Sequence, residues 1–169
     1  HTATLLGRKA EWSASVEMYR QAINQPPLDQ PSKQRHKKAR ALLLYYQSGA
    51  LLRQNRLDEA RESYDEALAL EKSISPDRYG VAANLTGLSD IPKLRGDLAA
   101  ATSLLEESIW QLQRIAPESM IVAATLNKLG IVAVRAGNLD EAEGHFQHGL
   151  RIYTEKDPNG VAAAGNINS

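Results

Sequence analysis

Residues 126–150 read LNKLGIVAVRAGNLDEAEGHFQHGL, which is the pattern of two short helices separated by a tight turn. In the first half, apolar residues recur at helical spacing at Leu126, Leu129 and Ala133. In the second half they recur at Leu139, Ala142, Phe146, Leu150 and Tyr153. Gly137-Asn138 separates the halves, and both residue types accept turn conformations that other residues resist. The segment therefore predicts a helical hairpin.

The same pattern returns at intervals of 41 residues. The corresponding residues are Gly137, Gly96 and Asn55 in the turn, Phe146, Leu105 and Tyr64 in the second helix, and Pro158, Pro117 and Pro76 after it. A period of this length that contains a helix–turn–helix is typical of a stacked array of repeats. We therefore predict an all-α fold in which one helical hairpin packs on the next.

Composition sets the class of protein and excludes several functions. The chain has 169 residues, with 20 basic and 20 acidic side chains, so no net charge attracts nucleic acid or a membrane surface. No apolar run approaches the length of a membrane span, and no secretory signal pattern opens the chain. The absence of cysteine excludes disulfides and thiolate metal sites and leaves the compartment open, with the cytoplasm as the default.

The repeat period divides the chain into one array with a partial first repeat and linker at 1–32, repeats at 33–77, 78–118 and 119–159, and the start of another at 160–169. Residues 1–12 are expected to end one helix and residues 12–23 to form the next. The segment 163–169 matches 122–128 at the same period. Both ends are therefore expected to be cut from a longer array.

Two residues depart from the repeat pattern. Gln47 stands where the other repeats carry leucine. Pro92 falls inside the first helix of the third repeat, where it removes a backbone hydrogen bond and crowds the carbonyl of Leu88, at a cost of about 3 kcal/mol. We therefore predict a kink or an early break within residues 85–95.

The pattern Leu-x2-Leu-Gly at 126–130, followed by Gly-Asn-Leu-Asp-Glu-Ala at 137–142, resembles the tetratricopeptide repeat. The usual period of that family is about 34 residues, so each helix here can be about one turn longer. This long variant resembles the repeats of kinesin light chains and of many bacterial arrays. The resemblance implies a right-handed α-α superhelix, and a non-catalytic scaffold that binds a protein or peptide in its concave groove.

The residues expected to face the groove are those on the first helices that packing does not use. The predicted ligand-binding residues are Tyr45, Arg53, Thr86, Asp90, Lys93, Asn127, Val134, Arg135 and Asn168. Asparagine at the place of Asn127 and Asn168 resembles a clamp for a ligand backbone, because a carboxamide is both donor and acceptor; a polar, solvated groove is the alternative. Arg53 and Arg135 suit an acidic peptide or a chain terminus, whereas solvated charge or pairing with Asp90 is the alternative.

Other patterns in the sequence give weaker support for a function. Glu141, His145 and His148 have metal-ligand spacing on one helix but lack a fourth ligand, which favours surface histidines. A basic cluster at 33–40 favours a solvated face over an acidic or phosphate-bearing partner. Phosphate-loop, nucleophile-elbow and zinc-protease motifs are missing, so we expect neither catalysis nor a cofactor.

Two further hypotheses stay open beside the scaffold. In one, the chain is the sensor or regulatory arm of a larger bacterial signalling protein or protease whose effector domain lies outside it. In the other, apolar ends at Leu5, Leu6 and Ile167 lead to self-association.

Overall fold

The computed structural model describes residues 2–24, 32–74, 78–113 and 115–157, without the side chains of residues 2–9, 32, 33 and 78. The helices are α1 (Thr2–Ile23), α2 (Ser32–Arg53), α3 (Leu57–Ile74), α4 (Arg78–Leu88), α5 (Asp90–Arg95), α6 (Leu98–Leu112), α7 (Met120–Ala136) and α8 (Leu139–Lys156). No strand occurs in these ranges, which confirms the all-α prediction. The helices group into two compact units, residues 1–91 and 92–169, which we call unit 1 and unit 2. The handedness of the array stays a prediction.

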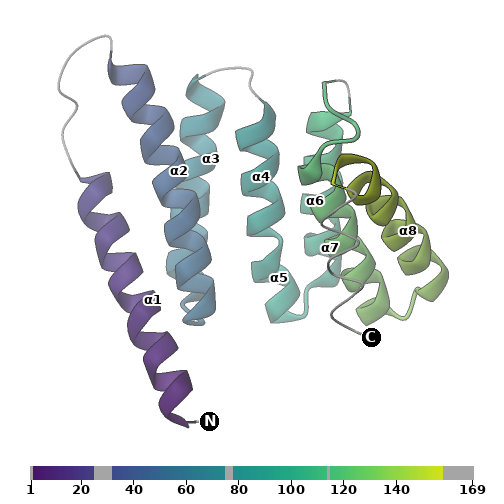
Figure 1. Cartoon of the computed structure of the whole chain (residues 1–169), viewed down its shortest axis with the longest axis horizontal. Helices are drawn as coiled ribbons and strands as arrows, with labels where there is room; N and C mark the ends of the chain where they lie inside the picture. The colour runs from purple at the N-terminus through teal and green to yellow at the C-terminus, as the bar shows by residue number, and fades with distance from the viewer. Residues whose placement is uncertain (1, 25–31, 75–77, 114, 158–169) are drawn as a thin grey trace. The chain divides into compact units, whose positions relative to one another are not determined.

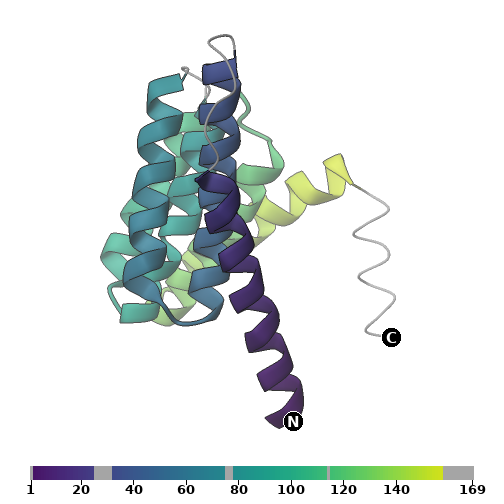
Figure 2. The same ribbon diagram turned by 90° about the vertical axis from the view of Figure 1, so that its left-hand side faces the viewer.

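Unit 1 places consecutive helices side by side, from α1 to α4 (Figures 1 and 2). Between α1, α2 and α3, the buried side chains of Ile23, Leu44 and Ala67 form a core cluster. Tyr19, Leu43 and Leu70 are partly buried against it. The cluster combines the apolar faces that the sequence pattern predicted for three successive helices, so neighbouring helices supply the surface that a single hairpin lacks.

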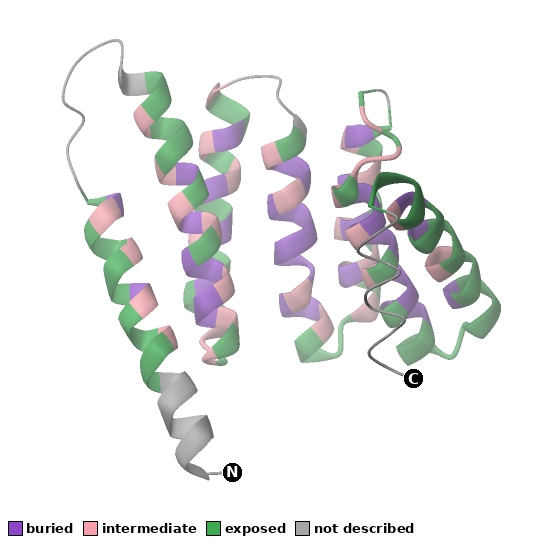
Figure 3. Ribbon diagram, in the orientation of Figure 1, coloured by how far each residue is buried: buried purple, intermediate pink, exposed green. Residues whose placement is uncertain are grey.

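Unit 2 is built on the contacts of α6 with α7 and of α7 with α8. Ala101 and Leu105 from α6 meet Leu129 and Val132 from α7 in a buried cluster. In Figure 3, α8 is mostly exposed, and its buried positions recur along one side, at Ala142, Gly149 and Ile152. Gly149 lets α8 approach α7 closely, because a Cβ there would lie 3.2 Å from the carbonyl oxygen of Ala123.

The predicted turns are confirmed at all three places where the period puts them. Asn55, Gly96 and Gly137 have positive φ angles of 60°, 84° and 84°, in the left-handed region that asparagine and glycine tolerate. The backbone bonds also repeat: the amide after each of these residues donates to the carbonyl five residues before it, at Leu51, Pro92 and Ala133. These bonds satisfy the last carbonyls of α2, α5 and α7. The backbone conformation of the turns therefore repeats every 41 residues, as the sequence does.

The expectation of two helices within residues 1–23 is wrong, because α1 runs unbroken from Thr2 to Ile23. The equivalent of the turn residue Asn55 in this first, differently spaced repeat is Ala10. Alanine is the strongest helix former and resists the left-handed conformation, so nothing ends the helix at this point.

The predicted break at Pro92 is confirmed. Helix α4 ends at Leu88, α5 begins at Asp90, and Ser89 lies between them (Figure 1). Proline has no amide hydrogen to donate to the carbonyl of Leu88, so the hydrogen-bond ladder is interrupted there. The hydroxyl of Ser89 turns back and donates to the carbonyl of Thr86 at 2.8 Å.

Asn84 carries an unsatisfied acceptor in α4. Its side-chain nitrogen donates to the carbonyl of Gly80 at 2.8 Å, but its Oδ1 is enclosed without a hydrogen-bond partner. At the equivalent position in α7, the hydroxyl of Thr125 donates to the carbonyl of Ile121 at 2.7 Å, and threonine has no carboxamide oxygen that would need a donor. We expect Asn84→Thr to raise the free energy of unfolding by about 1 kcal/mol, because it keeps the donor and removes the unpaired oxygen. Urea denaturation measures this change, and a destabilised variant would contradict the assignment.

Candidate binding surfaces

Two first helices carry a partly exposed stripe of residues in the same register. On α2, the stripe consists of Leu42, Tyr45, Gly49, Leu52 and Arg53, which we call the α2 stripe. On α7, it consists of Asn127, Ile131, Val134 and Arg135, which we call the α7 stripe. Leu42 and Val134 are 52% and 47% exposed, which is unusual for large aliphatic side chains in a packed helix. Each stripe lies away from the most buried positions of its helix, and Tyr45, Gly49 and Leu52 of the α2 stripe are half-buried.

Tyr45 is the anchor of an aromatic row in unit 1. Its ring meets the ring of Tyr64 edge to face, with centroids 5.9 Å apart, and the ring of Tyr46 at 5.6 Å. Tyr46 in turn stacks on Tyr19 of α1 at 6.2 Å. Such aromatic pairs add about 0.5–1.5 kcal/mol each beyond the area they bury. The row therefore fixes the Tyr45 side chain at the edge of the α2 stripe.

Three predicted site residues affect the pKa of the Tyr64 phenol. Burial raises the pKa of the Tyr64 phenol, and Tyr45 and Asp90 raise it further, whereas Arg53 lowers it. Burial also raises the pKa of the Tyr45 phenol, with smaller contributions from Tyr46 and Asp90. Both phenols therefore stay protonated at neutral pH and keep a hydroxyl donor.

These pKa shifts predict a loss of stability in alkali. A phenol whose pKa is higher in the folded state than its unfolded value of about 10 stabilises the protein fully below that pH, and the contribution is lost as the pH rises toward the folded pKa. Each such group adds a slope of about 1.4 kcal/mol per pH unit. We expect Tyr64→Phe to make the decline above pH 10 less steep when urea unfolding is repeated at several pH values. Parallel curves for the two proteins would contradict the buried phenol.

Arg53 is held at the end of the α2 stripe by an aromatic ring. Its guanidinium carbon lies 4.5 Å from the centroid of the Trp12 ring on α1. This cation–π contact leaves the N–H donors at the guanidinium edge available, because the attraction acts through the face of the ring. The sequence pattern did not predict this contact.

Arg135 has a structural bond in unit 2. One of its terminal nitrogens donates to the carbonyl of Lys93 at 3.2 Å, near the C-terminal end of α5. A cation at this place favourably meets the negative end of a helix. Arginine has five N–H donors, so the bond to Lys93 occupies only part of the side chain. The side chain of Arg135 and the backbone of Lys93 are thus joined in unit 2.

The remaining predicted ligand-binding residues differ in how exposed they are. Asn127 is exposed on the α7 stripe, in line with a contact to a ligand. Thr86 is only 7% exposed, so it offers a ligand little surface, unlike its equivalents Tyr45 and Asn127. Asn168 lies outside the residues that the structure describes.

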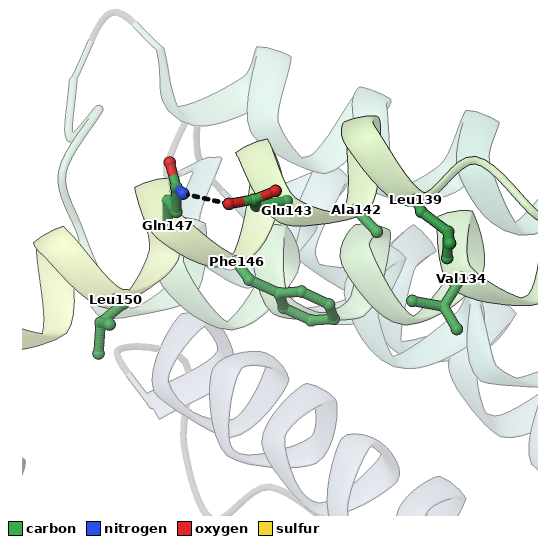
Figure 4. A pocket seen from close by; sticks show the side chains of 7 residues that line it. All are labelled: Val134, Leu139, Ala142, Glu143, Phe146, Gln147 and Leu150. Atoms are coloured by element: carbon green, nitrogen blue, oxygen red, sulfur yellow. Dashed lines mark hydrogen bonds between the residues drawn. The ribbon is translucent and has the colours of Figure 1, made fainter.

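Helix α8 carries an apolar hollow that sequence analysis did not predict. The hollow has a volume of about 350 Å³ and is lined by Val134, Leu139, Ala142, Glu143, Phe146, Gln147 and Leu150 (Figure 4). Leu139 and Leu150 are 65% and 56% exposed, whereas their equivalents in α6, Leu98 and Ile109, are packed against a core. The sequence pattern of the two helices is the same, so only the arrangement of neighbours distinguishes a packed face from an open one.

Metal and basic sites find no support in the described part of the chain. No group of three or more potential metal ligands occurs there, and His145 lies 3.5 Å from Glu141, as an ordinary pair along a helix. In the basic cluster, Arg40 is paired with Glu66, and Arg35, Lys37 and Lys38 are exposed. Nor does any described helix have the length and apolar character that crossing a membrane requires.

Comparison with known proteins supports the repeat assignment. Residues 39–109 and 94–155 match a family model described as tetratricopeptide repeat, and the two matches together span more than half of the chain. The fold is also similar to a crystal structure of BtubC (BKLC) from P. vanneervenii, with a TM-score of 0.67 and 20% sequence identity. That match covers 90% of this chain and 58% of the other. Comparison with the curated proteins gave no match.

Proposed function

The chain belongs to the tetratricopeptide repeat family, and from this we propose that it is a non-catalytic scaffold whose first helices bind a peptide or an extended partner segment. Repeats of this family generally mediate contacts between proteins. An array of this kind offers a long surface, and an extended segment can contact successive repeats along it. The cytoplasmic location stays a prediction.

The observation that carries the proposal is the pair of stripes on α2 and α7. Each combines exposed aliphatic surface with one large polar group in the middle and one arginine at the end of the helix. Tyr45 offers a protonated hydroxyl and Asn127 a carboxamide, and both can bond to a peptide backbone. Leu42, Ile131 and Val134 supply apolar surface beside them, at 52%, 38% and 47% exposure.

The two arginines support an acidic group on the partner. Arg53 lies over Trp12 and Arg135 is bonded to a backbone carbonyl, so both side chains are partly ordered before a ligand arrives. Ordering reduces the conformational entropy that binding must take away. Both remain exposed and keep free N–H donors, which suit a carboxylate.

The proposal is tested on partners captured from a lysate of the source organism and then purified. We expect Asn127→Ala with Arg135→Ala to weaken binding at least tenfold, which is about 1.4 kcal/mol. Glu143→Ala with Gln147→Ala is the matched control, because these residues bond to each other on α8 at 2.8 Å, outside the stripes. Equal affinities for the wild type and the α7 variant would overturn the proposal, and loss of binding in the control alone would move the site to α8.

Self-association is a separate prediction. The apolar residues that motivated it are Leu5, Leu6 and Ile167, whose side chains lie outside the described part of the structure. Light scattering across a concentration series measures it. A molecular mass that stays constant at the monomer value would contradict self-association.

A further inference from the structure

Unit 1 contains a polar pocket that the proposed peptide-binding stripes do not use. The pocket lies between α1, α2 and α3 and has a volume of about 340 Å³. Its lining includes Arg20, Arg40, Leu44, Gln47, Glu62 and Glu66. On α2, residues 40, 44 and 47 share one side of the helix at 100° per residue, whereas Tyr45 and Arg53 lie on another. The pocket and the α2 stripe are therefore distinct surfaces of the same helix.

Gln47 is a polar residue of this pocket at a position where the other repeats have leucine. The equivalent residues in the next two repeats are Leu88 and Leu129, which are buried at 6% and 4% exposure. Gln47 is just as buried, at 6%, yet within the described part of the chain its carboxamide makes no hydrogen bond. Asn84 Oδ1 is the described side-chain atom that is both fully enclosed and unpaired. The polar atoms of Gln47 therefore open into the pocket that it lines.

The Gln47 amide reaches the open space of the pocket, where water can bond to it until a ligand with matching donors and acceptors takes the place of the water. The chain has leucine at this position in two other repeats, so helix packing does not require glutamine. A ligand that supplies both an acceptor and a donor would satisfy both ends of the Gln47 amide.

The charges on the pocket wall select the kind of ligand. Arg40 Nε donates to Glu66 Oε1 at 3.0 Å, so these two charges neutralise each other. Arg20 Nη1 lies 3.6 Å from Glu17 Oε2, and Arg20 Nη2 lies 3.9 Å from Glu59 Oε2. The lining thus carries arginines and glutamates in equal number, Arg20 and Arg40 against Glu62 and Glu66. An anionic ligand would meet the glutamates and a cationic one the arginines, and a neutral polar group avoids both repulsions.

We propose that this pocket binds a neutral carboxamide, namely the side chain of a glutamine or asparagine on a partner protein. Two antiparallel N–H···O bonds join such a group to Gln47, each amide donating to the oxygen of the other. The apolar stem of the bound side chain lies against Leu44, which is 3% exposed.

The probe for this site is N-acetyl-glutamine amide, followed by two-dimensional NMR of the isotopically labelled whole chain. We expect saturable shifts, in the millimolar range, of the Gln47 side-chain amide and of backbone amides around Ile23, Leu44 and Ser63. N-acetyl-leucine amide and N-acetyl-glutamate amide test the choice of a neutral polar group. A wild-type protein without saturable shifts, or one that responds equally to the leucine probe, would overturn the proposal.

Two variants distinguish a loss of probe binding in the pocket from a loss of folding. We expect Gln47→Leu to fold with an equal or higher melting temperature and to bind the glutamine probe at least tenfold more weakly. Gln113→Leu, the same change at an exposed residue after α6, should leave binding unchanged. An unaltered response in Gln47→Leu would place the probe elsewhere and refute the assignment. The α7-stripe variants provide an independent readout, because they share no residue with this pocket.

Discussion

Leu105→Ala is expected to lower the free energy of unfolding by about 3 kcal/mol, within the range found when a fully buried leucine is truncated. The Leu105 side chain is 0% exposed and packs with Ala101, Leu129 and Val132 at the junction of α6 and α7. The alanine variant loses the transfer free energy of the removed groups and leaves a cavity that these neighbours fill only in part. Urea denaturation followed by circular dichroism measures the change.

Leu150→Ala is the matched control for this truncation. Leu150 lies on α8 and is 56% exposed, although its place in the helical pattern predicts a packing residue. An exposed substitution of this kind changes stability by about 0.5 kcal/mol or less. Similar losses in the two variants would mean that the α8 face is covered, contrary to the structure.

The second large effect is expected for Gly87→Ala, with a loss of about 2 kcal/mol from overpacking. A Cβ at Gly87 would lie 2.6 Å from the hydroxyl oxygen of Tyr64 and 2.7 Å from its ring. Tyr64 is 3% exposed and is also held by Tyr45, so the ring has little room to give way. The close approach of α3 and α4 therefore requires glycine at this position.

Gly49→Ala on α2 is expected to change stability in the opposite direction. No atom lies within 4 Å of a Cβ placed there, and the residue is in the middle of a helix. Alanine is favoured over glycine in a helix by up to about 1 kcal/mol. Thermal melts of the two variants should therefore shift to opposite sides of the wild type. A stabilised Gly87→Ala variant would contradict the packing of Tyr64 against α4.

The sequence period predicts the secondary structure well, because the signals that end a helix are local. Asn55, Gly96 and Gly137 have the left-handed conformation that their residue types favour, and Pro92 interrupts the ladder that it cannot join. The local signals also explain why two helices were wrongly expected in place of the continuous α1. Its turn was inferred from the spacing of apolar residues, while Ala10 at the turn position favours continuation of the helix.

The candidate sites are less predictable from sequence, because they depend on which side chains meet across helices. The sequence placed Tyr45 and Arg53 on one face of a helix, but their contacts with Tyr64 and Trp12 join residues on three helices. Gln47 was visible only as a departure from leucine, and its pocket depends on α1, α2 and α3 together. Thr86 fell in the predicted register and is nonetheless buried.

The helix α2 has two sides with different tasks. One packs in the core through Leu44 and Leu51, at 3% and 1% exposure, and the same side opens at Gln47 into the polar pocket. The other carries the stripe with Tyr45 and Arg53. A partner that reaches both surfaces would gain affinity from two linked contacts, because the second contact becomes intramolecular once the first has formed.

Site-specific photo-cross-linking tests the central claim, binding by the first helices, most directly. A photoreactive phenylalanine analogue replaces Leu42 on α2, Ile131 on α7 or Gln147 on α8, all exposed positions, and each protein is irradiated with a purified partner. The account predicts cross-links from positions 42 and 131 and none from position 147. Cross-links from position 147 alone would show that the partner binds the second helices and would contradict the account.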